Sequence, residues 1–186
     1  EIAFGVEMNV SSWVNKNYKL IRKQGLVLDL ACGSGRHGRF LLEKGFQVIF
    51  LDKDISNLRD LKLVSGAQLI KHNLEKGFSL PFPMQKFDAV LVTNYLHRPL
   101  FKSLLSVILD GGLLIYETFA KGNEVFGRPS NSNYLLEPEE LIDLIRPTLR
   151  VISFQEGYVN EGRKAVVQRV VAVKSGIRIT PNTIMS

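Results

Sequence analysis

Short, continuous apolar runs dominate the hydrophobic pattern of the chain. Strands that are covered on both faces of a parallel sheet lack polar alternation, so each run predicts a buried strand. Two later segments, joined through 160–162, predict a terminal β-hairpin instead. The predicted strands are 27–30, 47–51, 68–71, 87–93, 113–119, 151–159 and 164–173.

Amphipathic segments alternate with these runs and predict helices. The helix before the fifth strand is expected to carry Ile108 on its inward stripe, and Gly111-Gly112 then turns the chain into that strand. Strand–helix alternation closed by an antiparallel hairpin predicts a seven-stranded α/β sheet of order 3-2-1-4-5-7-6, with the last strand antiparallel and helices on both faces. Helices are expected over 11–23 and 39–44 and from Ile55, Pro99 and Pro138.

The 186 residues, of which 45% are apolar, predict a single domain over 1–175 and a C-terminal tail over 176–186. The sequence has no run of about 18 apolar residues and no basic–apolar–small leader, so we expect neither a membrane span nor a secretory signal. Its single cysteine, Cys32, cannot form an internal disulfide. The expected compartment is therefore the cytoplasm.

A turn of small residues joins the first strand to a helix. Gly33, Gly35 and Gly38 match G-x-G-x-x-G, the dinucleotide fingerprint. However, Asp29 lies inside the strand, where a dinucleotide-binding strand is usually apolar. A buried carboxylate needs donors, which the loop N–H groups and a ligand ammonium can supply. The residues favour an amino-acid-bearing cofactor, with a dinucleotide enzyme as the alternative.

The D-x-A-x-G-x-G pattern at 29–35 resembles the first motif of class I S-adenosylmethionine-dependent methyltransferases. The resemblance implies a Rossmann-like fold, S-adenosylmethionine as cofactor, S-adenosylhomocysteine as product, and a lid formed by the N-terminal helix within 1–24. The segments 93–100, 116–120 and 122–131 are similar to a narrower group of small bacterial methyltransferases. This tellurite-resistance-like group mostly lacks defined substrates, so the resemblance assigns no acceptor.

The cofactor residues are expected at the carboxyl ends of the strands. Asp52 ends the second strand, and its carboxylate can accept both ribose hydroxyls; the alternative is a helix cap, for which Asp54 is better placed. In the family, an Asp after the third strand usually hydrogen-bonds to the adenine, and this chain has Asn73 at that position. The alternative is that Asn73 only stabilises a turn. The expected cofactor-binding residues are Asp29, Ala31, Gly33, Gly35, Arg36, Asp52, Lys53, Asn73, Leu74 and Thr93.

The segment after the fourth strand supplies candidates for acceptor chemistry. His97 is the best general-base candidate, because histidine is the side chain most often used for that role, with a histidine bonded to backbone as the alternative. Tyr95 and Arg128 complete the expected catalytic set. No metal site is predicted.

The long polar loop 120–133 is expected to be an ordered substrate loop. Arg98 and Arg128 are suited to hold an anionic acceptor by paired hydrogen bonds. Alternatively, either arginine fixes the loop through Glu117 or Glu124.

The charge balance keeps a second class of acceptor open. A formal net charge of +6, a pI near 9.5 and a lysine stripe at 16, 19 and 23 suit an RNA or protein methyltransferase, although the stripe also suits a solvated helix face. Against this, Asn94-Tyr95-Leu96 lacks the prolines of the N/D-P-P-Y motif used on exocyclic amines. The expected partner is a small-molecule acceptor, with an anion among the candidates and nucleic acid less favoured. A non-catalytic S-adenosylmethionine-binding module is a third alternative, and the sequence makes no prediction of oligomeric state.

Overall fold

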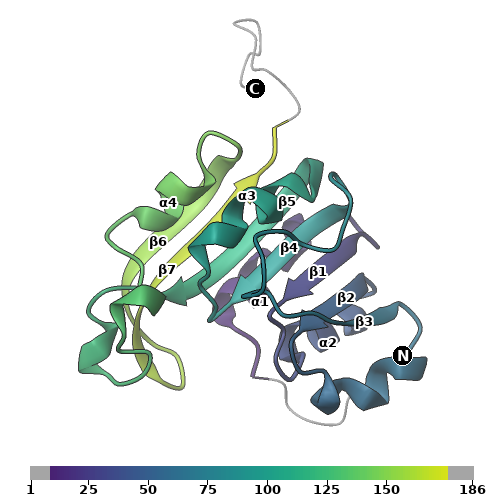
Figure 1. The fold of residues 1–186 in the computed structure, drawn as a ribbon, viewed down its shortest axis with the longest axis horizontal. Helices are drawn as coiled ribbons and strands as arrows, with labels where there is room; N and C mark the ends of the chain where they lie inside the picture. Colours follow the sequence, from purple (N-terminus) through teal and green to yellow (C-terminus); the bar gives the residue numbers. More distant parts are fainter. Residues whose placement is uncertain (1–8, 176–186) are drawn as a thin grey trace, which may run out of the picture.

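The computed structural model of the protein describes residues 9–175, which form one seven-stranded sheet of order β3-β2-β1-β4-β5-β7-β6 (Figure 1). Strands β1 to β5 pair in parallel, whereas β7 is antiparallel to both β5 and β6. The predicted strand order and Rossmann-like α/β class are therefore confirmed. The strands are β1 (Leu26–Leu30), β2 (Gln47–Asp52), β3 (Ala67–Lys71), β4 (Phe87–Thr93), β5 (Ile108–Phe119), β6 (Arg150–Asn160) and β7 (Lys164–Val173).

Short helices connect the strands. Residues 1–8 of the predicted lid segment and the predicted tail 176–186 lie outside the described residues. Within 9–175, no helix has both the length and the apolarity of a membrane span. The α-helices are α1 (Ser12–Asn17), α2 (Arg36–Glu43), α3 (Phe101–Ser106) and α4 (Glu140–Ile145), and the 3₁₀ helices are η1 (Tyr18–Leu20), η2 (Ser56–Leu63), η3 (Arg98–Leu100), η4 (Asn123–Val125) and η5 (Ser132–Tyr134).

Two of the predicted helices differ from expectation. The helix predicted over 11–23 ends at Asn17, whose side-chain amide donates to the Trp13 carbonyl oxygen at 2.8 Å and so offers the backbone a local alternative to helix bonding. The segment predicted to start a helix near Ile55 is the 3₁₀ helix η2. Its buried Leu58 and Leu61 are three residues apart, the spacing that aligns side chains on one edge of a 3₁₀ helix.

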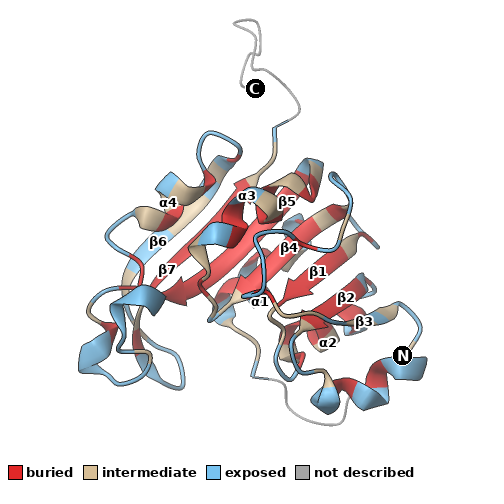
Figure 2. Ribbon diagram, in the orientation of Figure 1, coloured by how far each residue is buried: buried red, intermediate tan, exposed pale blue. Residues whose placement is uncertain are grey.

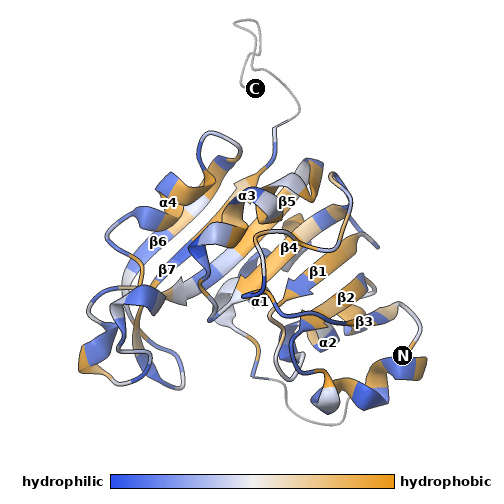
Figure 3. Cartoon of the chain, in the orientation of Figure 1, coloured by the Kyte–Doolittle hydropathy of each residue, from blue (hydrophilic) through white to orange (hydrophobic). Residues whose placement is uncertain are grey.

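The apolar strands are covered on both faces, as continuous runs require. Val27 packs in a cluster with residues of α1 and α2, and its neighbour Leu28 packs in a second cluster with residues of α3 and α4. Figure 2 shows the central strands buried, and Figure 3 shows that the same strands are the most hydrophobic part of the chain. Polar side chains are thereby left mainly to the strand ends and connecting loops.

Strand β5 begins earlier than predicted. Ile108, expected on the inner stripe of the preceding helix, already pairs with Phe87 of β4. The register then shifts between the pairs Phe87–Ile108 and Ala89–Leu113, so Gly111-Gly112 form an irregularity inside the strand and not a turn before it. Gly111 has φ +80°, and a Cβ on Gly112 would lie 2.8 Å from the Leu109 carbonyl oxygen, so both positions favour glycine.

Candidate functional site

A pocket of about 230 Å³ opens where β1, β2 and β4 end. Parallel strands bring their carboxyl ends to one edge of the sheet, so residues far apart in the sequence meet there. Five of the residues expected to bind the cofactor line this first pocket: Ala31, Asp52, Lys53, Asn73 and Leu74. Its remaining lining residues are His72, Glu75, Asn94 and Tyr95.

Asp52 ties the glycine turn to the chain after β2. Its Oδ2 accepts a hydrogen bond from the Gly33 N–H at 2.9 Å, and its Oδ1 accepts one from the Asp54 N–H at 3.0 Å. Asp54 in turn accepts from the N–H of Ser56, the first residue of η2, while Ile55 occupies the N-cap position. Since a carboxylate offers about four acceptor positions, Asp52 keeps lone pairs for a ligand in the pocket.

The glycines of the turn serve different purposes. A Cβ on Gly38 would lie 2.2 Å from Cε1 of Phe50, and one on Gly35 would lie 2.7 Å from Cδ2 of Leu58. These two glycines let α2 pack closely on β2. Gly33 has φ +55° and no atom within 4 Å of a built Cβ, so its bare backbone faces open space.

Replacing Gly38 by alanine is expected to lower the free energy of unfolding by about 2 kcal/mol or more, because the added methyl group overlaps the Phe50 ring and the Asp29 carboxylate. Urea unfolding measures the loss. Gly33→Ala is the matched control, since it meets no neighbour and bears only the strain of a positive φ, about 1 kcal/mol. Equal losses in the two variants would show that packing does not require Gly38.

Asp29 lies beneath the turn and lines neither of the pockets described in this section. Its side chain is buried, and its Oδ2 accepts a hydrogen bond from the Gly38 N–H at 2.9 Å. Burial raises the pKa of this carboxyl to about 7, against the opposing effect of that hydrogen bond. The loop N–H that was expected to satisfy Asp29 is thus present, while its contact with a ligand ammonium stays a prediction.

His37 connects three parts of the site from a buried position on α2. Its Nε2 accepts a hydrogen bond from the Ser11 N–H, which leaves the proton on Nδ1 to be donated to Thr93 Oγ1; both distances are 3.2 Å. Burial lowers the pKa of the ring to about 3. His37 is therefore neutral near pH 7, and it holds the N-terminal segment against the end of β4.

The depressed pKa of His37 makes it an acid-sensitive element. Between pH 6.5 and about 3 the His37 ring is protonated in the unfolded chain but stays neutral in the folded protein. As the pH falls through this range, His37 therefore lowers the free energy of unfolding by about 1.4 kcal/mol per pH unit. His37→Gln should therefore lose more stability relative to the natural protein at pH 8 than at pH 5, by urea unfolding.

Asp29 has the opposite effect on the pH dependence of stability, because its raised pKa lets the folded state hold a proton between about pH 7 and 4. The stability of Asp29→Asn relative to the natural protein should consequently be highest at pH 8, and parallel pH trends for the two variants would contradict at least one of the two assignments.

A second pocket, of about 330 Å³, lies between the N-terminal segment, the end of β5 and the β6–β7 hairpin. Asn94 lines both pockets and so marks where they adjoin. Arg36, expected to bind the cofactor, lines this second pocket and donates to the Asn9 carbonyl oxygen at 2.9 Å. The other lining residues are Val10, Ser11, Ser12, Glu117, Phe119, Val159, Glu161, Gly162, Arg163, Ala165, Val167 and Arg169.

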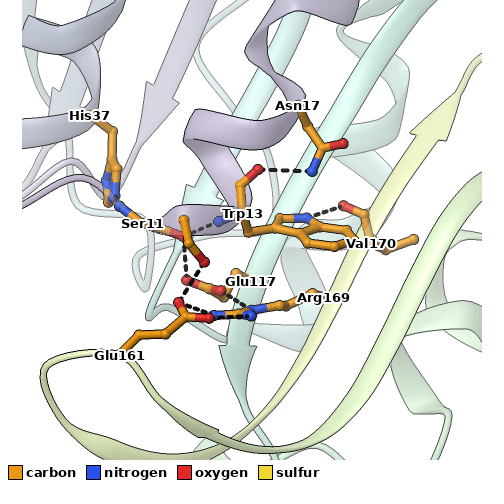
Figure 4. Close-up of polar contacts among 9 residues, drawn as sticks. Ser11, Trp13, Asn17, His37, Glu117, Glu161, Arg169 and Val170 are labelled. Carbon is orange, nitrogen blue, oxygen red and sulfur yellow. Dashed lines mark hydrogen bonds and ion pairs between the residues drawn. The ribbon is translucent and has the colours of Figure 1, made fainter.

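An ion network that contains the buried pair of Glu117 and Arg169 lines the second pocket (Figure 4). Arg169 Nε donates to Glu117 Oε2, and Ser11 Oγ donates to Glu117 Oε1 at 2.9 Å. The two other guanidinium nitrogens of Arg169 donate to Glu161 at 3.0 and 2.7 Å. Sequence analysis assigned Arg169 no role and considered Glu117 only as a partner for Arg98 or Arg128. The sequence does show a charged residue within each of two apolar strands, Glu117 and Arg169. The antiparallel register of β5 and β7 places these two residues opposite one another.

The expected catalytic residues do not converge on one pocket. Tyr95 lines the first pocket, burial raises its pKa to about 12, and its buried hydroxyl has no hydrogen-bond partner among residues 9–175. His97 lines neither pocket, and its Nε2 is likewise buried without a partner in this part of the chain. Arg128 is exposed and outside both linings, and its carbonyl oxygen accepts a hydrogen bond from Arg163 at 2.6 Å.

Arg98 fixes the loop and does not face either pocket. Its guanidinium donates to both carboxylate oxygens of Glu140 and to the carbonyl oxygens of Asn133 and Leu135. The suggestion that Arg98 holds an anionic acceptor is therefore wrong, because these partners occupy its donors. The loop-fixing alternative is right in kind, but its carboxylate is Glu140 and neither Glu117 nor Glu124. The loop 120–133 is ordered and contains η4, which is consistent with the expectation of an ordered loop.

Comparison with known proteins finds similarity to methyltransferases. Residues 27–112 match a family model described as a methyltransferase domain, whereas a search of curated proteins finds no match. The fold is similar to TehB from Haemophilus influenzae, with a TM-score of 0.72, 18% identity, and coverage of 89% of this chain and 63% of that one. It is also similar to 1,6-didemethyltoxoflavin-N1-methyltransferase from Burkholderia thailandensis, whose structure holds 1,6-didemethyltoxoflavin and S-adenosylhomocysteine, with a TM-score of 0.68, 16% identity, and coverage of 88% and 79%. At these identities the likeness concerns the fold.

Proposed function

We propose that this chain is an S-adenosylmethionine-dependent methyltransferase, because residues 27–112 match a methyltransferase domain model and lie in a Rossmann-like sheet. In this proposal the cofactor occupies the first pocket and a small-molecule acceptor occupies the second. The observation that carries the assignment is the position of Asp52, which ends β2, lines the first pocket and has acceptor positions to spare.

The residues of the first pocket fit the cofactor's nucleoside. The Asp52 carboxylate suits two ribose hydroxyls, and the side chain of Leu74 supplies an apolar surface for a flat ring. Asn73 Oδ1 accepts from the Glu75 N–H at 3.0 Å and retains a lone pair for an amino group. The unpartnered Tyr95 hydroxyl is a buried polar atom that a bound ligand would satisfy.

When bound, S-adenosylmethionine would supply a methyl group: a lone pair of the acceptor atom would bond to the methyl carbon in line with the breaking carbon–sulfur bond, and S-adenosylhomocysteine would leave. The contribution of the protein to such a reaction is alignment and the exclusion of water. In this chain, His37 and Asp52 hold the N-terminal segment and the glycine turn in place, and Asn94 stands at the junction of the two pockets. We retain Tyr95 as the proposed catalytic residue nearest the cofactor, whereas His97 and Arg128 would need to move in order to reach either pocket.

The size and walls of the second pocket support a small acceptor over RNA or protein. The pocket has a volume of about 330 Å³, and residues of the N-terminal segment line it. A hydrogen bond from Ser12 to Glu161 joins this segment to the β6–β7 hairpin. The lysines at 16, 19 and 23 lie on and after α1 and line neither of these pockets.

A non-catalytic module, the remaining alternative, would bind the cofactor without turnover on any acceptor.

Calorimetric titration with S-adenosylmethionine, S-adenosylhomocysteine and NAD tests the proposal. We expect dissociation constants on the order of micromolar for the first two ligands and no heat of binding for NAD. Binding of NAD alone would reject the proposal and favour a dinucleotide enzyme. Release of S-adenosylhomocysteine in the presence of an acceptor library then separates an enzyme from a binding module.

A further inference from the structure

The second pocket has an uneven supply of hydrogen-bonding groups. Its charged lining residues are Arg36, Glu117, Glu161, Arg163 and Arg169. Which of these can meet a ligand depends on which are already satisfied by the protein.

Both carboxylates are paired with Arg169. Both oxygens of Glu117 accept hydrogen bonds, from Ser11 and Arg169, and both oxygens of Glu161 accept from Arg169. Ser12 Oγ also donates to Glu161. Side-chain exposures of 9% for Glu117 and 7% for Arg169 place their ion pair almost out of contact with water. The charges of these carboxylates are thus directed at Arg169 and not at the open part of the pocket.

Two arginines keep most of their donors. Arg36 donates to the Asn9 carbonyl oxygen and Arg163 to the Arg128 carbonyl oxygen, and neither forms an ion pair with a carboxylate among residues 9–175. A guanidinium has five N–H donors, so several on each side chain remain for a ligand. The groups left to bind a ligand are thus cationic donors, which match the oxygens of a carboxylate in pairs.

Another part of the lining is apolar. Phe119, Ala165 and Val167 form a buried cluster against which Val159 packs, and all four line the pocket. The Arg163 guanidinium carbon lies 4.7 Å from the centroid of the Phe119 ring, so the cation stands next to this apolar surface. An inorganic oxyanion would use the arginine but leave the apolar part unfilled.

We propose that the second pocket binds a small organic carboxylate, with its carboxylate held by Arg163 and its apolar body against Phe119 and Val167. This inference rests on the proposed function and names the chemical class of its acceptor. Arg163 is the specificity-determining residue. Arg36 adds positive charge, but it also stands next to the glycine turn expected to hold the cofactor, so Arg163 is the cleaner residue to change.

The test uses the protein saturated with S-adenosylhomocysteine and a panel of aminobenzoates and hydroxybenzoates, each paired with its neutral benzamide. Binding is followed by saturation-transfer NMR and calorimetry. We expect carboxylates to bind and their amides to bind at least about tenfold more weakly, since the amide loses charge-assisted hydrogen bonds. Arg163→Gln should remove this preference, Arg163→Lys should keep part of it, and Arg59→Gln, which changes an exposed arginine on η2 outside both pockets, should leave it unchanged.

Three results would overturn the inference: no carboxylate of the panel binds at millimolar concentration, the amides bind equally well, or Arg163→Gln retains the preference. In each case S-adenosylhomocysteine would still bind, so the proposed function would stand. Failure of S-adenosylhomocysteine itself to bind would reject the proposed function before the panel is used.

Discussion

Replacing Asp52 by asparagine is expected to weaken S-adenosylhomocysteine binding by about 100-fold. Asp52 is the carboxylate at the end of β2 that lines the first pocket while accepting the Gly33 and Asp54 N–H groups. The asparagine side chain has one acceptor oxygen and places an NH₂ group where donors already point. The loss of two hydrogen bonds to a charged acceptor accounts for about 3 kcal/mol, which corresponds to this change in affinity. Calorimetry of the variant measures it.

Asp54→Asn is the control for charge alone. Asp54 is exposed, two residues further along the chain, and accepts from the Ser56 N–H at the start of η2. It does not line the first pocket, so its replacement should change the affinity by less than about twofold. If the two variants bind S-adenosylhomocysteine equally well, Asp52 does not contact the cofactor.

Replacing Arg169 by methionine is expected to lower the free energy of unfolding by about 3–5 kcal/mol. The substitution leaves Glu117 buried with its charge unpaired, and breaking one side of a buried pair costs this much. The double variant Glu117→Gln with Arg169→Met should recover part of the loss, because it removes the stranded charge as well. A double-mutant cycle by urea unfolding measures the coupling.

The exposed pair of Lys121 and Glu137 provides the matched comparison, with side-chain exposures of 50% and 54%. Lys121→Met should cost less than about 1 kcal/mol, because solvent screens an exposed pair. Losses of similar size for Arg169→Met and Lys121→Met would show that the wall of the second pocket does not depend on its buried ion pair.

The sheet could be predicted from the sequence because its pattern is simple. Continuous apolar runs mark strands covered on both faces, and the bounds of β4 were predicted to the residue. The final hairpin, with β7 at exactly the predicted residues 164–173, fixes the antiparallel end of the sheet. Apolar periodicity is less informative about the connections between strands. There α1 ends early at Asn17, and the segment with Leu58 and Leu61 three residues apart is the 3₁₀ helix η2.

The first pocket could be predicted for a related reason. Parallel strands share one edge for their carboxyl ends, so Asp52 and Asn73 meet there whatever the details of packing. The second pocket depends on information that the sequence does not display. The pairing of Glu117 with Arg169 requires the β5–β7 register, and the partner of Arg98 lies 42 residues away on α4.

The buried histidine illustrates the same limit. His37 follows the glycine turn in the sequence, but its side chain contacts Ser11 and Thr93. Both contacts join segments distant in the sequence, so they cannot be predicted from a local sequence pattern.

The most direct test of the two-pocket account is a crystal structure of the protein with S-adenosylhomocysteine bound. We expect the ribose hydroxyls at the Asp52 carboxylate, the adenine beside Asn73 and Leu74, and the sulfur facing the second pocket at Asn94. Electron density for S-adenosylhomocysteine in the second pocket, or its ribose away from Asp52, would contradict the account.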